Sequence, residues 1–338
     1  MTGRERILTA LKRQQPDCVP IFEWFIDDVV AKAMTGTTDP IEVVDALDLD
    51  GINVRPNYTR TCLSTDTYRD EWGAVRQLTG DILPAIIESP IKDIALHCDY
   101  NFPDPAAPHR FSSLEKTITR LGNRRALVWN LRDGWSDMRD LLGYEGALIA
   151  FIAETDHFRA LLDRVVDYNL AVARVARQRY GVEIVATTDD VANAGGLFLN
   201  PAQYVEIIGP AFKKVVAGYK DLGLLCIKHC DGDVTQVLDF WIETGIDCFD
   251  PVDPTAGMRM DVFKKRYGSR ICLKGNINCA GVLETGTPDE VRRDVRACIA
   301  AAGPAGLIVS SSNTIHRGVK PENFRAMIDT VREFGRKT

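Results

Sequence analysis

Short apolar segments alternate along the chain with longer segments whose apolar residues recur about every 3.6 positions. The first kind predicts strands and the second predicts amphipathic helices. Several strand segments are apolar at successive positions, which is typical of parallel strands that are covered on both faces. The predicted strands are residues 18–24, 51–57, 125–133, 183–190, 224–231, 247–253, 271–278 and 307–313.

Eight strands separated by helices fit an α/β fold, a single (β/α)8 TIM-type barrel. A doubly wound sheet would give the same alternation, but no GxGxxG follows the first strand and the sequence contains no P-loop. Residues 58–124 interrupt the alternation with a predicted β-hairpin, in DEWGAVRQLTGDILPAIIESP, and a proline-rich loop, NFPDPAAPHRF. We therefore expect one barrel over residues 1–338, with an elaboration of its N-terminal half at about 58–124.

Composition argues against several classes of function. The 338 residues include 41 Lys and Arg against 47 Asp and Glu, and the absence of a basic stripe disfavours nucleic-acid binding. No apolar segment approaches the roughly 18 residues that span a bilayer, and the charged N-terminal segment lacks the apolar region of a signal peptide. The nine cysteines are scattered without a CxxC pair. We expect a cytoplasmic protein with reduced thiols that acts on a small molecule.

Polar residues fall at the end of every predicted strand, where the chemistry of such barrels lies. Hydrogen bonding within loops and helix capping would also place polar groups there, so position alone does not assign a role. Six residues at this rim are predicted to bind substrate: Glu23, Trp24, Arg55, Asn130, Asn276 and Asn313. The aromatic side chains Trp24, Tyr58, Trp72 and Trp135 either line a small apolar substrate or belong to the core.

The segment IKHCDGD carries the clearest pattern for chemistry. His229 and Asp231 are one residue apart at a strand end, so both side chains leave the same face, whereas Cys230 points toward the helices. Such a pair supplies either two metal ligands or a histidine with the carboxylate that orients it. Gly232 permits a tight turn after the strand.

Neighbouring strand ends add carboxylates to this pair. Of the adjacent Asp189 and Asp190, one at most can face the cavity, and we expect it to be Asp190. His229, Asp231 and Asp190 are therefore the predicted catalytic groups. His229, Asp231 and Asp250 form a predicted ligand set of hard donors for a divalent metal ion such as zinc.

Consecutive blocks over nearly the whole chain resemble a known family. They include RERILTALKRQQPDCVPIFEW, TTDDVANAGGLFLNPAQYVEIIGPAFKKV, KHCDGDVTQVLDFWIETGIDCFDPVDPTAGM and LKGNINCAGVLETGTPDEV. This order of blocks is similar to the uroporphyrinogen decarboxylase superfamily, and more narrowly to its corrinoid-linked methyltransferase (demethylase) branch. The resemblance implies a (β/α)8 barrel with its active cleft at the carboxyl ends of the strands.

The chain departs from two patterns that this resemblance implies. Porphyrinogen decarboxylases would carry an arginine-rich loop after the first strand, but EWFIDDVVAKAMTG has no arginine, and Ser312 and Asn313 replace a late Gly-His pair. The thiol-methylating branch would hold zinc through His-x-Cys at the fifth strand and a cysteine at the eighth. Here Asp231 and Ser-Ser-Asn stand at those places. We expect neither a cationic clamp for a porphyrinogen nor a thiolate zinc site.

The remaining implication of the resemblance is methyl transfer from a small methoxy or methylamine substrate to a corrinoid. The corrinoid would be carried by a partner protein, because no Asp-x-His-x-x-Gly segment is present. An acid at His229, tuned by Asp231, would assist a poor leaving group. Alternatives are a decarboxylase or lyase that holds a small acid through Arg55 and Arg132, and a barrel that has lost its chemistry. The oligomeric state stays open, with a homodimer as one alternative.

Overall fold

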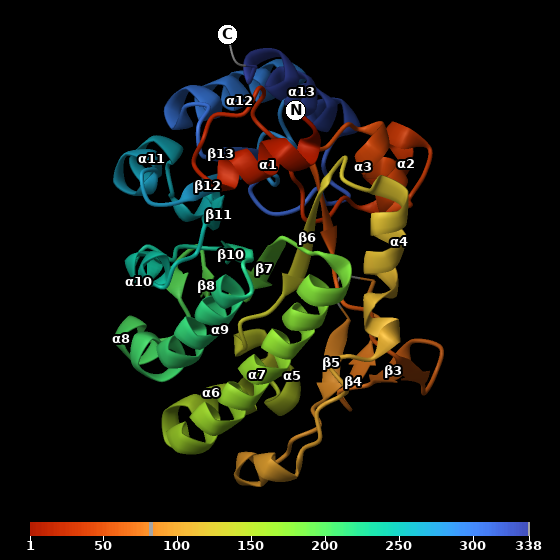
Figure 1. Cartoon of the computed structure of the whole chain (residues 1–338), viewed down its shortest axis with the longest axis vertical. Helices are drawn as coiled ribbons and strands as arrows, with labels where there is room; N and C mark the ends of the chain where they lie inside the picture. The colour runs from red at the N-terminus through yellow and green to blue at the C-terminus, as the bar shows by residue number, and fades with distance from the viewer. Residues whose placement is uncertain (81–83, 337–338) are drawn as a thin grey trace.

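The structure is a computed structural model that describes residues 1–80 and 84–336. Its central sheet is parallel and has the strand order β1-β6-β7-β10-β11-β12-β13, so each strand pairs with the next of the series (Figure 1). The strands are β1 (Gly51–Val54), β6 (Ala126–Leu131), β7 (Ile184–Thr188), β10 (Leu225–His229), β11 (Cys248–Val252), β12 (Cys272–Ile277) and β13 (Leu307–Ser311).

Residues 18–24 close this sheet, but they are not the regular strand that the sequence predicts. Phe22 N donates to Val309 O (3.2 Å), Val309 N donates to Pro20 O (2.9 Å), and Asp50 N donates to a carbonyl of the same segment (2.9 Å). Pro20 has no N–H, so the ladder is reduced to isolated bridges. The predicted TIM-type barrel is confirmed, with its first strand corrected to an irregular extended segment.

Helices cover the outer face of the sheet (Figure 1). They are α2 (Asp28–Thr35), α3 (Pro40–Ala46), α4 (Ser112–Leu121), α7 (Thr155–Tyr180), α9 (Gly209–Asp221), α10 (Leu238–Glu243), α11 (Met260–Tyr267), α12 (Pro288–Ala302) and α13 (Pro321–Phe334). One apolar cluster joins the helices to the outer strand faces and a second fills the barrel, which explains strands that are apolar at successive positions. No helix within residues 1–80 and 84–336 is long and apolar enough to cross a membrane.

The helix α1 (Gly3–Leu11) closes the end of the barrel at which the strands begin. Thr2 caps it in a capping box with Glu5, and its face with Ile7 and Leu11 belongs to the inner apolar cluster. Arg4 pairs with Glu183, the residue before β7, at 2.7 Å. Chemistry inside the barrel is therefore accessible from the opposite end.

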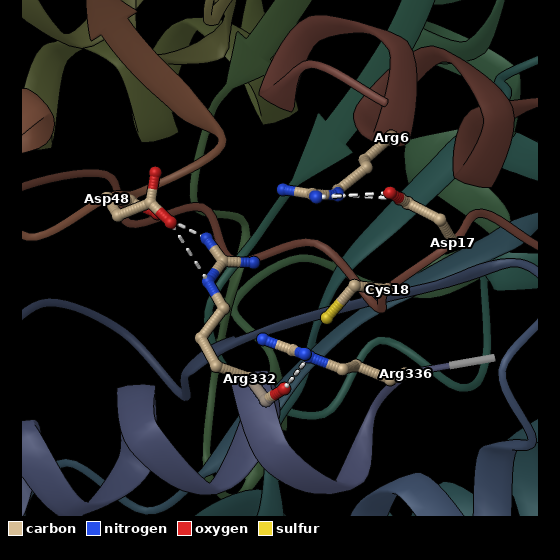
Figure 2. A pocket seen from close by; sticks show the side chains of 6 residues that line it. All are labelled: Arg6, Asp17, Cys18, Asp48, Arg332 and Arg336. Carbon is tan, nitrogen blue, oxygen red and sulfur yellow. Dashed lines mark hydrogen bonds and ion pairs between the residues drawn. The ribbon is translucent and has the colours of Figure 1, made fainter. Parts of the chain in front are cut away.

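Ion pairs fasten α1 and α13 at this closed end. Figure 2 shows a pocket there in which Arg6 Nε lies 2.7 Å from Asp17 and Arg332 pairs with Asp48. Both arginines also contact the buried Asp50, at 3.1 and 2.9 Å. Carboxylates thus neutralise Arg6 and Arg332, which is typical of a structural clasp, whereas Arg336 Nε donates to Arg332 O (2.9 Å).

Insertions after the strands surround the other end. A four-stranded antiparallel sheet follows β1, and α5, α6 and α8 also lie in this half of the molecule (Figure 1). The elements are β2 (Arg60–Cys62), β3 (Thr67–Asp70), β4 (Val75–Gln77), β5 (Ala85–Glu88), η1 (Ile94–Asp99), η2 (Pro108–Phe111), α5 (Trp135–Leu142), α6 (Tyr144–Ala153), β8 (Ala192–Asn193), β9 (Gly196–Leu197), α8 (Pro201–Gln203), the π-helix η3 (Tyr204–Ile208) and η4 (Pro254–Ala256).

The predicted hairpin at the start of the elaboration corresponds to β4 and β5, which pair antiparallel. Part of its turn, residues 81–83, lies outside the described residues. The sequence analysis missed β2 and β3, because β2 is short and exposed and takes its pairing from β3 alone. Arg76 on β4 contacts Asp140 on α5 at 2.8 Å and thereby ties the small sheet to the barrel.

Candidate functional site

His229, the last residue of β10, is turned into the barrel. Ile227, two residues earlier on the same face, belongs to the inner apolar cluster, so the alternation of the strand also directs the imidazole inward. Its Nδ1 lies 2.6 Å from Asp250 Oδ2, and the edge of its ring meets Trp24 with the ring centroids 5.3 Å apart. The side chain is 11% exposed. Nδ1 is thus engaged inside the barrel, and Nε2 faces the ends of the neighbouring strands.

Asp250 on β11 holds the imidazole of His229 through its Nδ1. Its Oδ2 also accepts a hydrogen bond from Trp24 Nε1, and its Oδ1 accepts one from Lys274 Nζ at 2.7 Å. Burial favours the neutral acid, but the charge of Lys274 and the hydrogen bond from His229 outweigh it and lower the pKa of Asp250 to about 2. Asp250 is therefore an ionised, fully buried acceptor that holds Nδ1 as a donor.

Two carboxylates lie on the Nε2 side. Asp231 Oδ1 is 3.5 Å and Asp190 Oδ1 is 4.0 Å from His229 Nε2. Asp231 N donates to Asp190 Oδ1 (2.9 Å), and Asn313, beyond β13, donates through Nδ2 to Asp231 Oδ2 (2.5 Å). The barrel thus brings together three predicted catalytic residues and one predicted substrate-binding residue.

The charges of this cluster change the titration of its members. Burial opposes protonation of His229, but the charges of Asp231 and Asp250 outweigh it and raise the pKa above its ordinary value. Burial, together with Asp190 and Asp250, raises the pKa of Asp231 to about 6, although His229 acts in the opposite direction. A protonated imidazole beside a carboxyl group of raised pKa can deliver a proton near neutral pH.

The ligand set that the structure brings together differs from the predicted one. Asp250 uses its oxygens for His229, Trp24 and Lys274, so it supports the imidazole instead of joining a metal set. Among the described residues, Asp190, His229 and Asp231 form the group that could hold a metal ion, with ligand atoms all within 4.8 Å of one another. Asp231 Oδ1 is buried without a hydrogen-bond partner, and the donors are hard, so a divalent cation fits this group.

Polar contacts inside the barrel engage two further predicted residues. Glu23 is buried and accepts hydrogen bonds from Ser311 N (2.7 Å) and Ser311 Oγ (2.6 Å). Burial raises its pKa to about 7, against the charge of Lys274. Asn130 on β6 donates to Asn53 Oδ1 (3.0 Å) and accepts from Thr188 Oγ1 (2.8 Å). These two side chains are satisfied within the protein, and their role in substrate binding stays a prediction.

The remaining predicted side chains lie at the rim. Asn276 is half-buried on β12, and Arg55 is exposed directly after β1. Of the aromatic residues, Trp24 touches His229, whereas Trp135 is fully buried against Phe151 and is core. Of the two alternatives that the sequence left open for Trp135, the structure shows the second, a core residue.

The sequence analysis did not recognise two buried lysines, one inside the site and one on the helix-covered face of the same sheet. Lys274 supports Asp250 inside the barrel, and Lys228 Nζ lies 2.6 Å from Asp133 Oδ2 on the outer face of β10. Both occur within apolar strand segments, LKGN and CIKHC. A lysine in the middle of a buried parallel strand requires a carboxylate partner, so this signal was present in the sequence.

The family profile named "Uroporphyrinogen decarboxylase (URO-D)" matches residues 75–334. The chain belongs to the URO-D family. A solved structure, "methyltransferase from Methanosarcina mazei", covers 99% of both chains with a TM-score of 0.77 at 17% identity and shows the same fold. The predicted resemblance to this superfamily and to its methyltransferase branch is confirmed.

Curated relatives of this URO-D member carry two kinds of name. The chain is 26% identical over 176 residues to the methylated-thiol–coenzyme M methyltransferase of Methanosarcina mazei (52% of this chain, 44% of the relative). It is 30% identical over 137 residues to the methylcobamide:CoM methyltransferase MtbA of the same organism (39% and 37%). A uroporphyrinogen decarboxylase of Neisseria meningitidis is 24% identical over 188 residues (52% and 49%). The chain spans less than half the length of these relatives.

Proposed function

We propose that this URO-D member transfers a methyl group from a small methoxy or methylamine compound to a corrinoid carried by a partner protein. The observation that carries the proposal is the placement of His229, held at Nδ1 by Asp250 and open at Nε2 toward Asp190 and Asp231. The names of two relatives, a methylated-thiol and a methylcobamide methyltransferase, support methyl transfer as the reaction class.

The chemical difficulty of this reaction lies in the leaving group. The methyl carbon would take the electron pair of its new bond from the cob(I)amide acceptor, and the pair of the broken C–O or C–N bond would stay on the heteroatom. That heteroatom is a poor anion and leaves well only when it gains a proton. In this proposal His229 Nε2–H donates the proton, and the raised pKa of the imidazole favours its protonated form.

A metal ion is a second way to assist the same leaving group. Asp190, His229 and Asp231 would hold it, and a bound divalent ion would act as a Lewis acid on the departing heteroatom. Asp231→Asn removes one charged ligand and should lower the zinc content of purified protein, measured by elemental analysis. Equal metal content in the wild type and the variant would contradict this ligand set.

Decarboxylation of a small acid is the second proposed function. Arg55 at the rim and the similarity to uroporphyrinogen decarboxylases favour it. Arg132, the other predicted carboxylate holder, is engaged by Asp137 (3.1 Å) and Asp140 (2.8 Å), which leaves it less suited to that role. Release of carbon dioxide from a methoxybenzoic acid, without demethylation, would favour the decarboxylase.

The deciding experiment combines purified protein, cob(I)alamin and a panel of methoxyaromatics and methylamines. Methylcobalamin should appear, as followed by its absorbance, together with one equivalent of the demethylated product. Formation of neither product with any compound of the panel would contradict the proposal. Arg293→Gln, on the exposed face of α12, is a control variant that should form methylcobalamin at the wild-type rate.

A further inference from the structure

Arg55 stands on a rigid base at the open end of the barrel. It directly follows β1 and precedes Pro56, which restricts its backbone to extended conformations. Asn57, which follows Pro56, makes two hydrogen bonds to the neighbouring segment. Its N donates to Arg110 O (2.9 Å), and its Oδ1 accepts from Ser113 N (2.9 Å). The backbone that carries Arg55 is therefore fixed at the carboxyl end of β1.

Arginines on elements next to Arg55 have carboxylate partners. Arg132 contacts Asp140, Arg76 contacts Asp70 at 2.6 Å, and Arg110 contacts Glu71 at 2.6 Å. The guanidinium of Arg55 has no hydrogen bond or ion pair to any residue that the structure describes. Arg55 is exposed and the positive charge of Arg132 acts on it, so an added negative charge would be favourable there.

The geometry of the sheet places Arg55 at the same rim as the His229 cluster. β1, β6, β7 and β10 are consecutive neighbours, and Arg55 and Asp190 follow β1 and β7. The charge of Asp190 acts on Arg55, which agrees with this common location. Between them, on β1 and β6, the inward side chains Asn53 and Asn130 are neutral amides. Arg55 and His229 thus lie at strand ends of the same rim, with two neutral amides on the strands between them.

We propose that Arg55 binds a carboxylate of the methylated substrate, and that the substrates are small methylated carboxylic acids. The carboxylate pairs with the guanidinium, and the heteroatom that bears the methyl group lies toward His229. This inference rests on the proposed function for the direction of the reaction, but the binding step itself needs no corrinoid. A planar guanidinium with an exposed donor edge recognises a carboxylate bidentately, which a lysine does less well.

The test measures binding by calorimetry, with 3-methoxybenzoate against 3-methoxybenzamide and N,N-dimethylglycine against its amide. The preferred acid should bind the wild type about tenfold to a hundredfold more tightly than its amide, the size expected of one charge-assisted contact. Arg55→Gln should abolish this preference and leave amide binding unchanged, and Arg55→Lys should restore part of it. Arg293→Gln should keep the full preference.

Several outcomes would overturn the inference. They are equal binding of acid and amide by the wild type, an unchanged preference in Arg55→Gln, or no binding of either acid. Failure of the proposed function looks different, because acids would still bind with the Arg55-dependent preference while methylcobalamin never forms. Circular dichroism of each variant shows that the fold is kept.

Discussion

Asp250 holds the imidazole of His229 in place. It is buried, ionised and shared between the imidazole, the indole of Trp24 and the ammonium of Lys274. Because it accepts from Nδ1, it fixes both the orientation of the ring and the side that carries the free Nε2. The negative charge also helps to raise the pKa of His229.

Asp250→Asn should lower the pKa of His229 and destabilise the protein. The variant removes a charge and a charge-assisted hydrogen bond from the imidazole, and it leaves Lys274 buried without its carboxylate. Breaking a buried pair in this way costs about 3–5 kcal/mol. NMR titration of the histidine and urea denaturation measure the two effects.

A double variant separates these effects. Asp250→Asn with Lys274→Met removes the unpaired ammonium, so stability should recover while the pKa of His229 stays low. An unchanged His229 pKa in both variants would contradict the orienting role of Asp250.

Glu23 should make stability depend on pH. Its pKa is about 7 in the folded protein, against an ordinary value of 4.5. The folded state thus binds the proton more tightly, so this contribution to stability is present below pH 4.5 and is lost as the pH rises through 7. Glu23→Gln removes this titration. The free energy of unfolding of the variant, relative to that of the wild type, should therefore rise by about 3 kcal/mol from acid to alkaline pH.

Denaturation of both proteins at about pH 5 and about pH 8 checks this prediction. The difference between Glu23→Gln and the wild type should be larger at the higher pH. Parallel pH profiles of the two proteins would show that Glu23 does not titrate in this range.

The element that presents the site is β10 with its following turn. Gly232 has φ +86°, and a Cβ at this position would lie 2.4 Å from Asn193 O. Gly257 has φ +74° and open space around it. Gly257→Ala should lose about 1–2 kcal/mol from backbone strain alone, and Gly232→Ala should lose distinctly more, because its backbone clash adds to the strain. Urea denaturation compares them, and equal losses would show that the turn does not depend on close packing.

Local pattern predicted β10 and its site well. Single-residue alternation was sufficient to direct His229 and Asp231 inward and to bury Cys230, whose Sγ contacts Val191 N at 3.4 Å. It was not sufficient for residues 18–24, because Pro20 interrupts a ladder whose apolar pattern is otherwise that of a strand.

Some contacts of the site form only in the folded molecule and cannot be predicted from any single segment. Asn313 and Asp231 are 82 positions apart and meet because β13 and β10 end at the same rim. The predicted metal set contained Asp250, whereas the structure has Asp190 on the Nε2 side of His229 and Asp250 on the Nδ1 side. This difference depends on how deep each carboxylate lies in the barrel, which spacing in the sequence does not encode. The sequence indicated that Lys274 needs a carboxylate partner but not which one, since Asp250 stands on another strand.

The barrel as a whole is closed at one end by α1 and carries its polar cluster at the other. The chain belongs to the URO-D family and shares the fold of a solved methyltransferase structure. In the proposed account, His229 is oriented from within the barrel and donates a proton at the rim. There a small methylated acid transfers its methyl group to the corrinoid.

The most direct measurement is the single-turnover rate of methylcobalamin formation from the preferred methylated acid, in the wild type and in His229→Gln. The glutamine keeps a polar side chain but cannot act as an acid, so the rate should fall about 10²–10⁴-fold while Arg55-dependent binding of the acid persists. A folded His229→Gln protein that transfers the methyl group at nearly the wild-type rate would contradict the account.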